Sequence, residues 1–450
     1  MADSTSVTAA LATLQAAGWN VTPGNTYQGA GVLNASQAAW VQSSVSGGGV
    51  LAPSNIGTKC VQPFGDTAAH GIDRTYHFET VIEADADQFR IALFNVHTST
   101  MTGIKAAVGV SDTIGTDVTS TTYTATTWVD YTWAAASSVT LPIGAAGRPS
   151  VTVSDWMQLS TIARTDGGTL PVVHTRIEVP SANVTATKFS PVVADTAWLR
   201  DPTLCGGRIF RAMFTDALAV TTKGAFTGTS ASPRWFPFAI QYKSRKRIRT
   251  IFPVGDSIAG GVAAAGENYY RSAYFEAQAL TSTIAKPIEL ANFGWSGQTS
   301  TQYALRLQDL ITAGVLGKGC VVPYHAWTPN DITGTIDATE VTGLRWRAYD
   351  AYDRIQTAGG WPILTLGTPA NNAAKAYGSS DSLRIAYNAE IAASGLPYWD
   401  LSTVLSGAVN SGQIEYSATA STDGLHPKAG ATGYGLAAPV FVAAAGAALT

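Results

Sequence analysis

Cysteine is scarce in this chain of 450 residues, which contains three of them, Cys60, Cys205 and Cys320. Disulfide-stabilised domains have many cysteines in even numbers, so three cysteines exclude a disulfide framework. Cys320 opens an apolar run and is expected to be a buried thiol, whereas Cys60 and Cys205 could form a single pair. A chain of this length is long for one domain and has the length expected of two.

Charged residues are also few, at 13% of the chain against about 25% in typical soluble domains. The 28 basic and 31 acidic residues leave a net charge of −3, and neither half is strongly basic, so nucleic acid is not expected as a partner. The basic stretch from Lys243 to Arg249 favours a solvated interdomain linker, with a site for an anionic polymer as the alternative. Low charge with abundant Ser, Thr, Ala and Gly predicts an extracellular or particle-surface protein.

The sequence lacks the patterns of targeting, membrane and metal-binding segments. Its first residues contain no basic segment followed by an apolar one, so no signal peptide is expected. The apolar stretch 436–450 is interrupted by Pro439 and is too short to span a bilayer, so it is expected to be the last helix packed on a sheet. No His-Glu-x-x-His, paired Cys-x-x-Cys or phosphate-binding loop occurs. The sequence thus predicts no cofactor, no metal and no membrane span.

What the chain does contain is a serine directly after a buried strand. The apolar and β-branched run 249–254 predicts the strand, and Gly255-Asp256-Ser257 closes it with a tight turn that Asp256 is expected to hold. Open α/β sheets place reactive groups at the carboxyl ends of their strands. Three further blocks follow in order: Asn292 to Gly297, Pro329-Asn330-Asp331 and Asp423 to His426.

These four blocks resemble the SGNH, or GDSL-type, serine hydrolase family, which is named for a serine, a glycine, an asparagine and a histidine on four separate blocks. The resemblance covers roughly residues 247–450. It implies that Ser257 is the nucleophile, that His426 is its base and that Asp423 orients the base.

The resemblance also implies an oxyanion hole made of the backbone N–H groups of Ser257 and Gly294 and the side-chain amide of Asn330. Gly294 is expected to be glycine because, without a Cβ, its N–H can approach the reacting carbonyl closely. One residue departs from the family pattern. Thr328 stands where the third block usually has glycine, and its Cβ could tilt the Asn330 amide.

The same triad follows from the chemistry of the residues. A serine hydroxyl is a poor nucleophile unless a neighbouring base takes its proton. Two histidines follow Ser257 in the chain, and His426 lies three residues after Asp423, so one short loop can supply both base and carboxylate. His325, at the end of a buried strand, is expected to be structural, with pocket lining as the alternative. The rival α/β-hydrolase elbow, Gly-x-Ser-x-Gly, is excluded because Ala259 stands at its last position.

Residues 247–450 alternate apolar runs with helical patterns. Strands are predicted near 248–254, 287–291, 319–324, 361–367 and 397–401. Helices are predicted near 267–285, 299–314, 340–358, 379–394 and 430–448. This alternation implies a three-layer α/β domain with a parallel, flavodoxin-like sheet that helices cover on both faces.

Residues 70–246 show a different pattern. Short strands with turn residues between them, and no long helical pattern, predict an accessory β-sandwich or jelly-roll domain. Residues 1–69 are expected to be an N-terminal arm with a short helix near 5–17. Trp128, Trp133 and Trp156 could stack on sugar rings, or they could fill the core of the sandwich.

The function expected from these features is serine ester hydrolysis, with an O-acetyl ester of a carbohydrate as substrate. One alternative is a lipase or thioesterase-like acyl hydrolase. Another is a glycan-attachment protein on a particle surface, such as a phage tail, whose hydrolase domain trims a host glycan or is inactive.

Overall fold

The computed structural model describes most of the chain from residue 54 to residue 449. The described residues are 54–60, 73–111, 122–123, 127–145, 148–162, 172–183, 190–191, 210–220, 223, 226–228, 234–262, 272–331, 337–370, 381–410, 413–416, 420–428 and 432–449. The helix expected near 5–17 and the residue Cys205 lie outside these ranges. That helix and the pairing of Cys60 with Cys205 therefore stay predictions.

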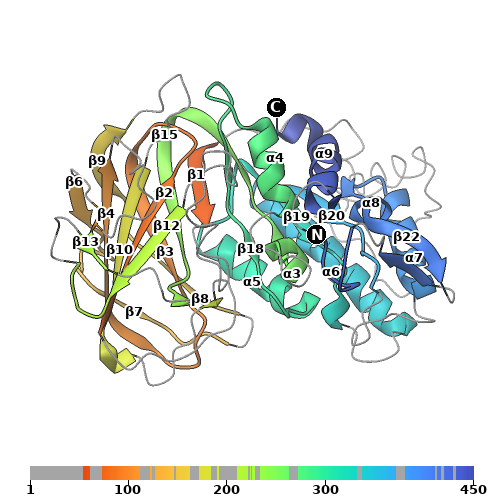
Figure 1. Ribbon diagram of the computed structural model, residues 1–450, viewed down its shortest axis with the longest axis horizontal. Helices are drawn as coiled ribbons and strands as arrows, with labels where there is room; N and C mark the ends of the chain where they lie inside the picture. Colours follow the sequence, from red (N-terminus) through yellow and green to blue (C-terminus); the bar gives the residue numbers. More distant parts are fainter. Residues whose placement is uncertain are drawn as a thin grey trace, which may run out of the picture.

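A parallel sheet forms the centre of the second half (Figure 1). Its strands are β15 (Phe238–Ile251), β16 (Val254–Gly255), β17 (Ile288–Leu290), β18 (Phe293–Gly294), β19 (Cys320–His325), β20 (Trp361–Thr365) and β21 (Tyr398–Trp399). Counted along the chain, the end of β15 together with β16 is the first strand of this sheet, and β17 together with β18 is the second. The third, fourth and fifth strands are β19, β20 and β21. The spatial order is 2-1-3-4-5 with every pair parallel, which is the flavodoxin-like order expected for this half.

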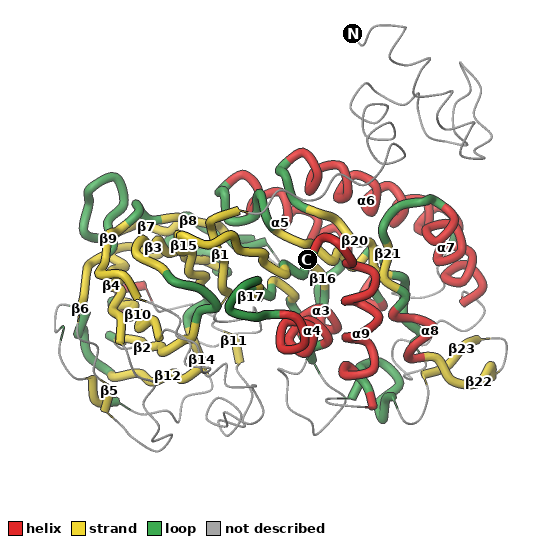
Figure 2. The backbone as a smooth tube through the Cα atoms, turned by 90° about the horizontal axis from the view of Figure 1, so that it is seen from above, coloured by secondary structure: helices red, strands yellow, loops and turns green. Residues whose placement is uncertain are grey.

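Helices cover both faces of this sheet (Figure 2). One face carries α5 (Ser300–Thr312), α6 (Ala338–Thr357) and α7 (Asp381–Ala393), and the other carries α4 (Ala273–Thr281), α8 (Leu401–Leu405) and α9 (Tyr434–Ala445). Successive strand residues alternate between the two faces. Val322 and Leu364 pack on the side of α5 to α7, whereas Val321 and Ile363 pack on the side of α4 and α9.

Local sequence signals start the two long helices. Thr299 and Gln302 form a capping box at the start of α5, and Asp337 and Glu340 form one at the start of α6. In each box the first side chain accepts a backbone N–H inside the helix and the second reaches back to the cap, so free N–H groups of the first turn are satisfied. Both long helices thus begin at residues whose side chains satisfy the first backbone N–H groups.

Two sheets of the first half face each other. One is antiparallel and contains β2 (Arg74–Val81), β4 (Met101–Ser111), β6 (Thr127–Asp130), β7 (Val139–Leu141), β10 (Val172–Val179) and β12 (Phe210–Thr215). The other contains β1 (Ser54–Cys60), β3 (Ala86–Asn95), β8 (Ser150–Val153), β9 (Met157–Ile162) and the start of β15. Phe78 on β2 and Phe238 on β15 meet in their common core, with ring centroids 4.6 Å apart. This packing is typical of β-sandwiches, but a jelly roll, and an all-β unit separate from the second half, stay predictions.

The strand β15 belongs to both halves. Residues 238–243 of β15 pair antiparallel with β1 and β3, and residues 249–251 pair parallel with β17 and β19. The boundary expected at residue 246 therefore falls inside a continuous strand. The prediction that the basic stretch is a solvated interdomain linker is wrong, because residues 243–249 are part of β15. The expected arm 1–69 contains one strand of the sheet, β1.

A buried polar cluster holds the two halves together beside β15. Glu289 on β17 is fully buried, and its carboxylate accepts hydrogen bonds from Lys59 Nζ (2.9 Å), Tyr242 Oη (2.9 Å) and the backbone N–H of Glu83 (3.1 Å). Gln278 on α4 donates to the same carboxylate (3.2 Å). The first half thus supplies three of the donors that this carboxylate of the second half needs.

The remaining elements are short. They are β5 (Thr122–Tyr123), β11 (Ser190–Pro191), β13 (Phe226–Thr227), β14 (Arg234–Trp235), β22 (Ser406–Asn410), β23 (Gln413–Tyr416), α3 (Ser257–Gly260) and the 3₁₀ helices Ser181–Asn183, Pro329–Asp331 and Gly446–Ala448. None of the helices in the described ranges is long and apolar enough to cross a membrane.

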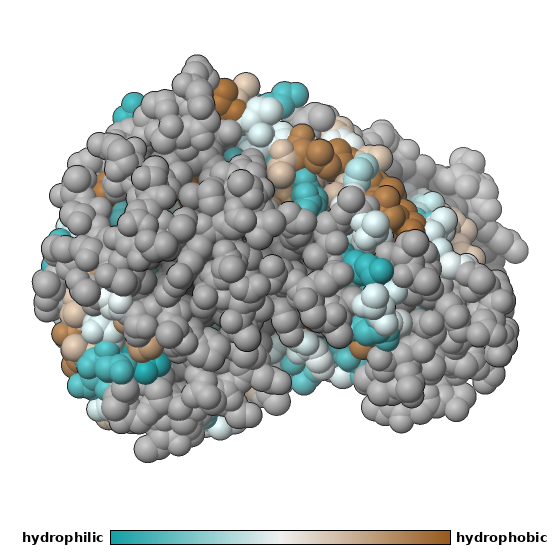
Figure 3. Space-filling model, in the orientation of Figure 1, coloured by the Kyte–Doolittle hydropathy of each residue, from teal (hydrophilic) through white to brown (hydrophobic). Residues whose placement is uncertain are grey.

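Figure 3 shows apolar side chains at the surface over α4 and α9, the helices that carry the exposed Leu280 and Leu436.

Candidate active site

Ser257 lies beyond the carboxyl end of β16, which is part of the first strand of the parallel sheet along the chain. The strand β16 ends at Gly255, and Ser257 is the first residue of the short helix α3. Asp256 caps this helix, since its Oδ1 accepts from the backbone N–H groups of Ile258 (2.9 Å) and Ala259 (3.5 Å). The structure therefore confirms that Asp256 holds the turn. Ser257 is 6% exposed.

A hydrogen-bonded relay joins Ser257 to the fourth block. His426 Nε2 lies 3.0 Å from Ser257 Oγ, and His426 Nδ1 lies 2.9 Å from Asp423 Oδ2. An ionised carboxylate only accepts hydrogen bonds, so the ring proton sits on Nδ1. The lone pair of Nε2 then faces the serine hydroxyl. The structure thus brings together the three residues that the sequence placed in one triad.

The loop itself fixes Asp423. Asp423 Oδ1 accepts from the backbone N–H groups of His426 (2.8 Å) and Leu425 (2.9 Å) and from Ser421 Oγ (3.1 Å). Burial alone would raise the pKa of Asp423, but these donors and the ring N–H of His426 outweigh burial and hold the pKa below its ordinary value. The carboxylate is therefore ionised at neutral pH and fixed opposite Nδ1.

Gly294, in the second block, packs closely on the helix that begins at Ser257. A Cβ on Gly294 would lie 2.0 Å from the backbone N of Gly260 and 2.5 Å from the carbonyl carbon of Ala259. Only glycine allows this approach. The Gly294 N–H donates to Asn292 Oδ1 (2.9 Å), so it is engaged within its own loop. The structure thus gives Gly294 a packing reason for being glycine, and its oxyanion role stays a prediction.

The same loop ends at a second glycine, Gly297, to which the sequence pattern assigns no role. Gly297 has φ of +76°, and an added Cβ would meet nothing within 4 Å. A positive φ turns the backbone in a way that other residues rarely adopt. In the sequence, Gly297 is marked only by its place at the end of the block Asn292-x-Gly294-x-x-Gly297. The next residue, Gln298, accepts a hydrogen bond from Asn330 of the third block through its carbonyl.

The third block lies in a short 3₁₀ helix after β19. Asn330 Nδ2 donates to the carbonyl of Gln298 (3.1 Å), so its amide links the second and third blocks. An amide NH₂ has two donors, and this bond uses one of them. Asp331 Oδ1 accepts from the backbone N–H of Ser300 (3.0 Å) at the start of α5. Burial raises the pKa of Asp331.

His325 is a structural residue behind the nucleophile. It is buried, its Nε2 lies 2.6 Å from Tyr274 Oη, and its Nδ1 lies 3.8 Å from Asp256 Oδ1. Burial lowers the pKa of His325 to about 4, so the ring is neutral at neutral pH. The structural interpretation of His325 is therefore the one that the geometry supports.

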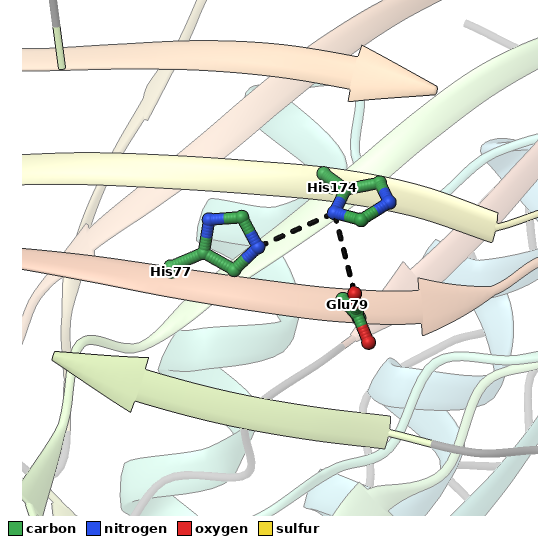
Figure 4. A group of neighbouring side chains, drawn as sticks. All are labelled: His77, Glu79 and His174. Atoms are coloured by element: carbon green, nitrogen blue, oxygen red, sulfur yellow. Dashed lines mark hydrogen bonds and ion pairs between the residues drawn. The ribbon is translucent and has the colours of Figure 1, made fainter. Parts of the chain in front are cut away.

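One group of side chains in the described residues has the composition of a metal site. His77 and Glu79 on β2 and His174 on β10 are buried, and their ligand atoms lie within 4.8 Å of one another (Figure 4). His77 Nε2 is 3.3 Å from His174 Nδ1. Arg176 Nε donates to His77 Nδ1 (3.1 Å), and because arginine stays protonated, the His77 proton must sit on Nε2. That proton points at His174, so His77 as placed has no lone pair for a cation, and the adjacent guanidinium repels one.

Of the three tryptophans that could stack on sugars, Trp133 is buried, and Trp128 and Trp156 are half-buried with cationic side chains over their rings. Arg176 lies over the Trp128 ring at 4.4 Å, and Trp133 is buried at 7% exposure. Arg90 and Lys243 both lie over the Trp156 ring, at 4.7 Å and 4.6 Å. Cation–π contacts thus occupy the rings of Trp128 and Trp156, which favours the packing interpretation of these residues.

Comparisons with known proteins give matches in structure. No protein-family model and no curated protein matches the sequence. A GDSL-like lipase from Bacteroides thetaiotaomicron is similar at 21% identity and a TM-score of 0.32, over 44% of this chain and 86% of that one. A lipase/acylhydrolase from Enterococcus faecalis is similar at 20% identity and a TM-score of 0.33, over 44% and 95%. A carbohydrate acetylesterase family member from Sinorhizobium meliloti is similar at 18% identity and a TM-score of 0.31, over 44% and 98%.

The four blocks of the sequence meet at one edge of the parallel sheet. The four blocks occur in the order Ser257, Gly294 to Gly297, Asn330 and His426. Hydrogen bonds or close backbone contacts join each of them to the turn at Ser257 or to the block beside it. The four blocks thus stand in the order of the SGNH/GDSL-type pattern, which this chain resembles, and they gather at one edge of the sheet.

Proposed function

We propose that this protein is a serine ester hydrolase with Ser257 as nucleophile, His426 as base and Asp423 as the residue that orients the base. The observation that carries the proposal is the relay Ser257 Oγ–His426 Nε2–Nδ1–Asp423 Oδ2, with distances of 3.0 Å and 2.9 Å. Both distances are within reach of proton transfer. This is the arrangement of roles in a Ser-His-Asp triad.

The proposed reaction has two halves. His426 Nε2 takes the hydroxyl proton as Ser257 Oγ adds to the ester carbonyl carbon, and the tetrahedral intermediate then expels the alcohol, which receives that proton. This leaves an acyl group on Ser257. His426 next takes a proton from water while the water oxygen adds to the acyl carbon, and Ser257 leaves with the proton as the acid is released.

Each tetrahedral intermediate carries an oxyanion that needs donors. We propose the backbone N–H of Ser257, at the start of α3, and the second N–H of the Asn330 amide. The Gly294 N–H can take part only if it leaves Asn292 Oδ1, so the loop that contains Gly297 is the alternative source of a backbone donor. No step in this scheme requires a metal or an organic cofactor.

The substrate that we propose is a short acyl ester, an O-acetyl group on a carbohydrate of an extracellular or particle-surface setting. The low exposure of Ser257, 6%, supports a small acyl group, because a long chain needs an open apolar channel beside the nucleophile. A series of p-nitrophenyl esters of increasing chain length tests this. An enzyme with a long acyl pocket should gain about 0.8 kcal/mol per added CH₂, whereas the proposal requires activity to fall beyond the shortest esters. Release of acetate from acetylated glycans then tests the carbohydrate.

The nucleophile is tested by Ser257→Ala, with Ser394→Ala as the matched control. Ser394 is also buried and has its hydroxyl bonded to a backbone carbonyl, but it lies at the end of α7. Turnover of p-nitrophenyl acetate should fall by roughly 10⁴-fold or more in the first variant and remain in the second. A serine-directed phosphonate should label wild type at Ser257, and labelling at any other residue would contradict the assignment.

A further inference from the structure

Thr328 contacts two of the blocks that meet at Ser257. It is fully buried between β19 and the 3₁₀ helix that holds Asn330. Its hydroxyl donates to Asp256 Oδ2 and accepts from the backbone N–H of Asn330 (3.2 Å). One hydroxyl group thus joins the turn before the nucleophile to the turn that holds an oxyanion donor.

Asp256 transmits this contact to the nucleophile. Its other oxygen, Oδ1, accepts from the backbone N–H groups of Ile258 and Ala259, in the helix whose first residue is Ser257. Asp256 is 1% exposed, so water does not replace these bonds. The path from the Asn330 backbone to the helix of Ser257 is therefore continuous: one backbone N–H, one hydroxyl and one carboxylate.

This path explains why threonine is tolerated where the family pattern has glycine. With glycine at position 328, Asp256 Oδ2 and the Asn330 N–H would both lose the partner that this structure shows. Leaving a buried donor or acceptor without a partner costs more free energy than one hydrogen bond contributes to stability. The side chain that was expected to disturb the Asn330 amide instead fixes its backbone.

We infer that Thr328 is a positioning residue that sets the separation between the nucleophile turn and the Asn330 turn through its hydroxyl group. The inference rests on the proposed function, because it concerns the geometry in which an oxyanion is bound. Thr328 itself touches neither Ser257 Oγ nor the substrate in this scheme. Its effect is on kcat, since the oxyanion forms after substrate has bound.

Three variants of Thr328 separate this role from simple packing. Thr328→Val keeps the shape and removes the hydroxyl group, Thr328→Ser keeps the hydroxyl group and removes a methyl group, and Thr328→Gly restores the family residue. Displacement of a catalytic group by about 1 Å can cost 10²-fold in rate. We therefore expect kcat on p-nitrophenyl acetate to fall about 10- to 100-fold in Thr328→Val and Thr328→Gly. KM should stay within about threefold of wild type in all three, and Thr328→Ser should restore most of kcat.

The control is Thr250→Val. Thr250 is a buried threonine of β15 whose hydroxyl oxygen accepts from the backbone N–H of Thr58 (3.3 Å), away from the four blocks. All variants are assayed at a temperature at which circular dichroism shows them folded, and their rates of Ser257 labelling by the phosphonate are compared. Labelling should slow in Thr328→Val but not in Thr250→Val, because only the former changes the donors around the phosphonyl oxygen.

The outcomes are distinct. A Thr328→Val enzyme with wild-type kcat and labelling rate would overturn the inference while leaving the proposed function intact. So would a Thr328→Ser enzyme as slow as Thr328→Val, because the methyl group and not the hydroxyl group would then matter. A wild-type protein that neither turns over esters nor reacts with the phosphonate would overturn the proposed function, and this inference with it.

Discussion

Lys59 Nζ and Glu289 Oε1 lie 2.9 Å apart, although 230 residues separate them in the chain. Lys59 comes from β1, inside the segment expected to be an arm, and Glu289 comes from β17 of the parallel sheet. The glutamate side chain is 0% exposed and the lysine side chain 13%. The carboxylate is thus buried at the junction of the two halves, where it depends on donors from both.

Lys59→Met should destabilise the protein, because it removes the cation beside a buried carboxylate. Loss of one partner of a buried pair costs about 3 kcal/mol or more. The matched control is Lys223→Met, which removes an exposed ion pair with Asp130 and should cost less than about 1 kcal/mol. Chemical denaturation with the fluorescence of the tryptophans as signal measures both. Equal effects of the two substitutions would contradict the role assigned to Glu289.

Asp423→Asn should reduce kcat by about 10⁴-fold with little change in the fold. An asparagine amide can donate to Nδ1 of His426, and the ring would then carry its proton on Nε2, which faces Ser257. Asp400→Asn is a suitable control, since Asp400 caps α8 outside the site and should leave kcat unchanged. Steady-state kinetics on p-nitrophenyl acetate gives the comparison. A loss of less than tenfold in Asp423→Asn would argue against the triad.

Asn330→Ala should lower kcat by roughly 10²- to 10³-fold, the cost of one lost oxyanion donor, with little change in KM. The bond from Nδ2 to the Gln298 carbonyl holds the amide in place and leaves one N–H for the oxyanion. Asn330→Asp keeps the shape but replaces donors by negative charge, so its loss should be at least as large. A loss below about fivefold in Asn330→Ala would mean that another donor binds the oxyanion.

His325 should make the protein less stable as the pH falls from about 6.5 to about 4. The pKa of His325 is lowered to about 4 by burial, whereas in the unfolded chain the ring takes up its proton near pH 6.5. Between these values the unfolded state binds more protons, so acid favours unfolding. Above pH 6.5 the ring is neutral in both states and contributes no pH dependence.

His325→Gln should remove this contribution. Each pKa unit corresponds to about 1.4 kcal/mol, so between pH 7 and pH 4.5 the stability of wild type should fall by roughly 3 kcal/mol more than that of the variant. Unfolding free energies from urea titrations at the two pH values measure the difference. Parallel pH profiles for the two proteins would show that His325 is protonated alike in the folded and unfolded chain.

The sequence predicted those parts of the site that depend on local spacing. Asp423 and His426 are three residues apart in one loop, so their pairing follows from the chain itself. Ser257 follows a strand whose residues are β-branched and apolar, and its place at a sheet edge follows from that pattern. The order of strands and helices after residue 246 was also visible, because each element has its own periodicity.

What the sequence could not predict depends on partners far away in the chain. The change of pattern near residue 246 lies where β15 changes partners, from β1 and β3 to β17 and β19. The packing of Gly294 against Gly260 depends on how α3 lies against β18. The cationic side chains over Trp156 are Arg90 on β3 and Lys243 on β15, so the sequence near Trp156 does not predict them.

The continuity of β15 also matters while the protein is being made. Ile251 leaves the ribosome before residues 288–290 and 320–321, with which the end of this strand pairs. Until those residues emerge, the end of β15 is an open edge of a sheet that is already forming, and open edges tend to pair with other chains. Arg245 and Arg247 are exposed on this strand, and charge on an open edge opposes such pairing. In the folded chain, β17 and β19 pair with residues 249–251 from both sides and so close that edge.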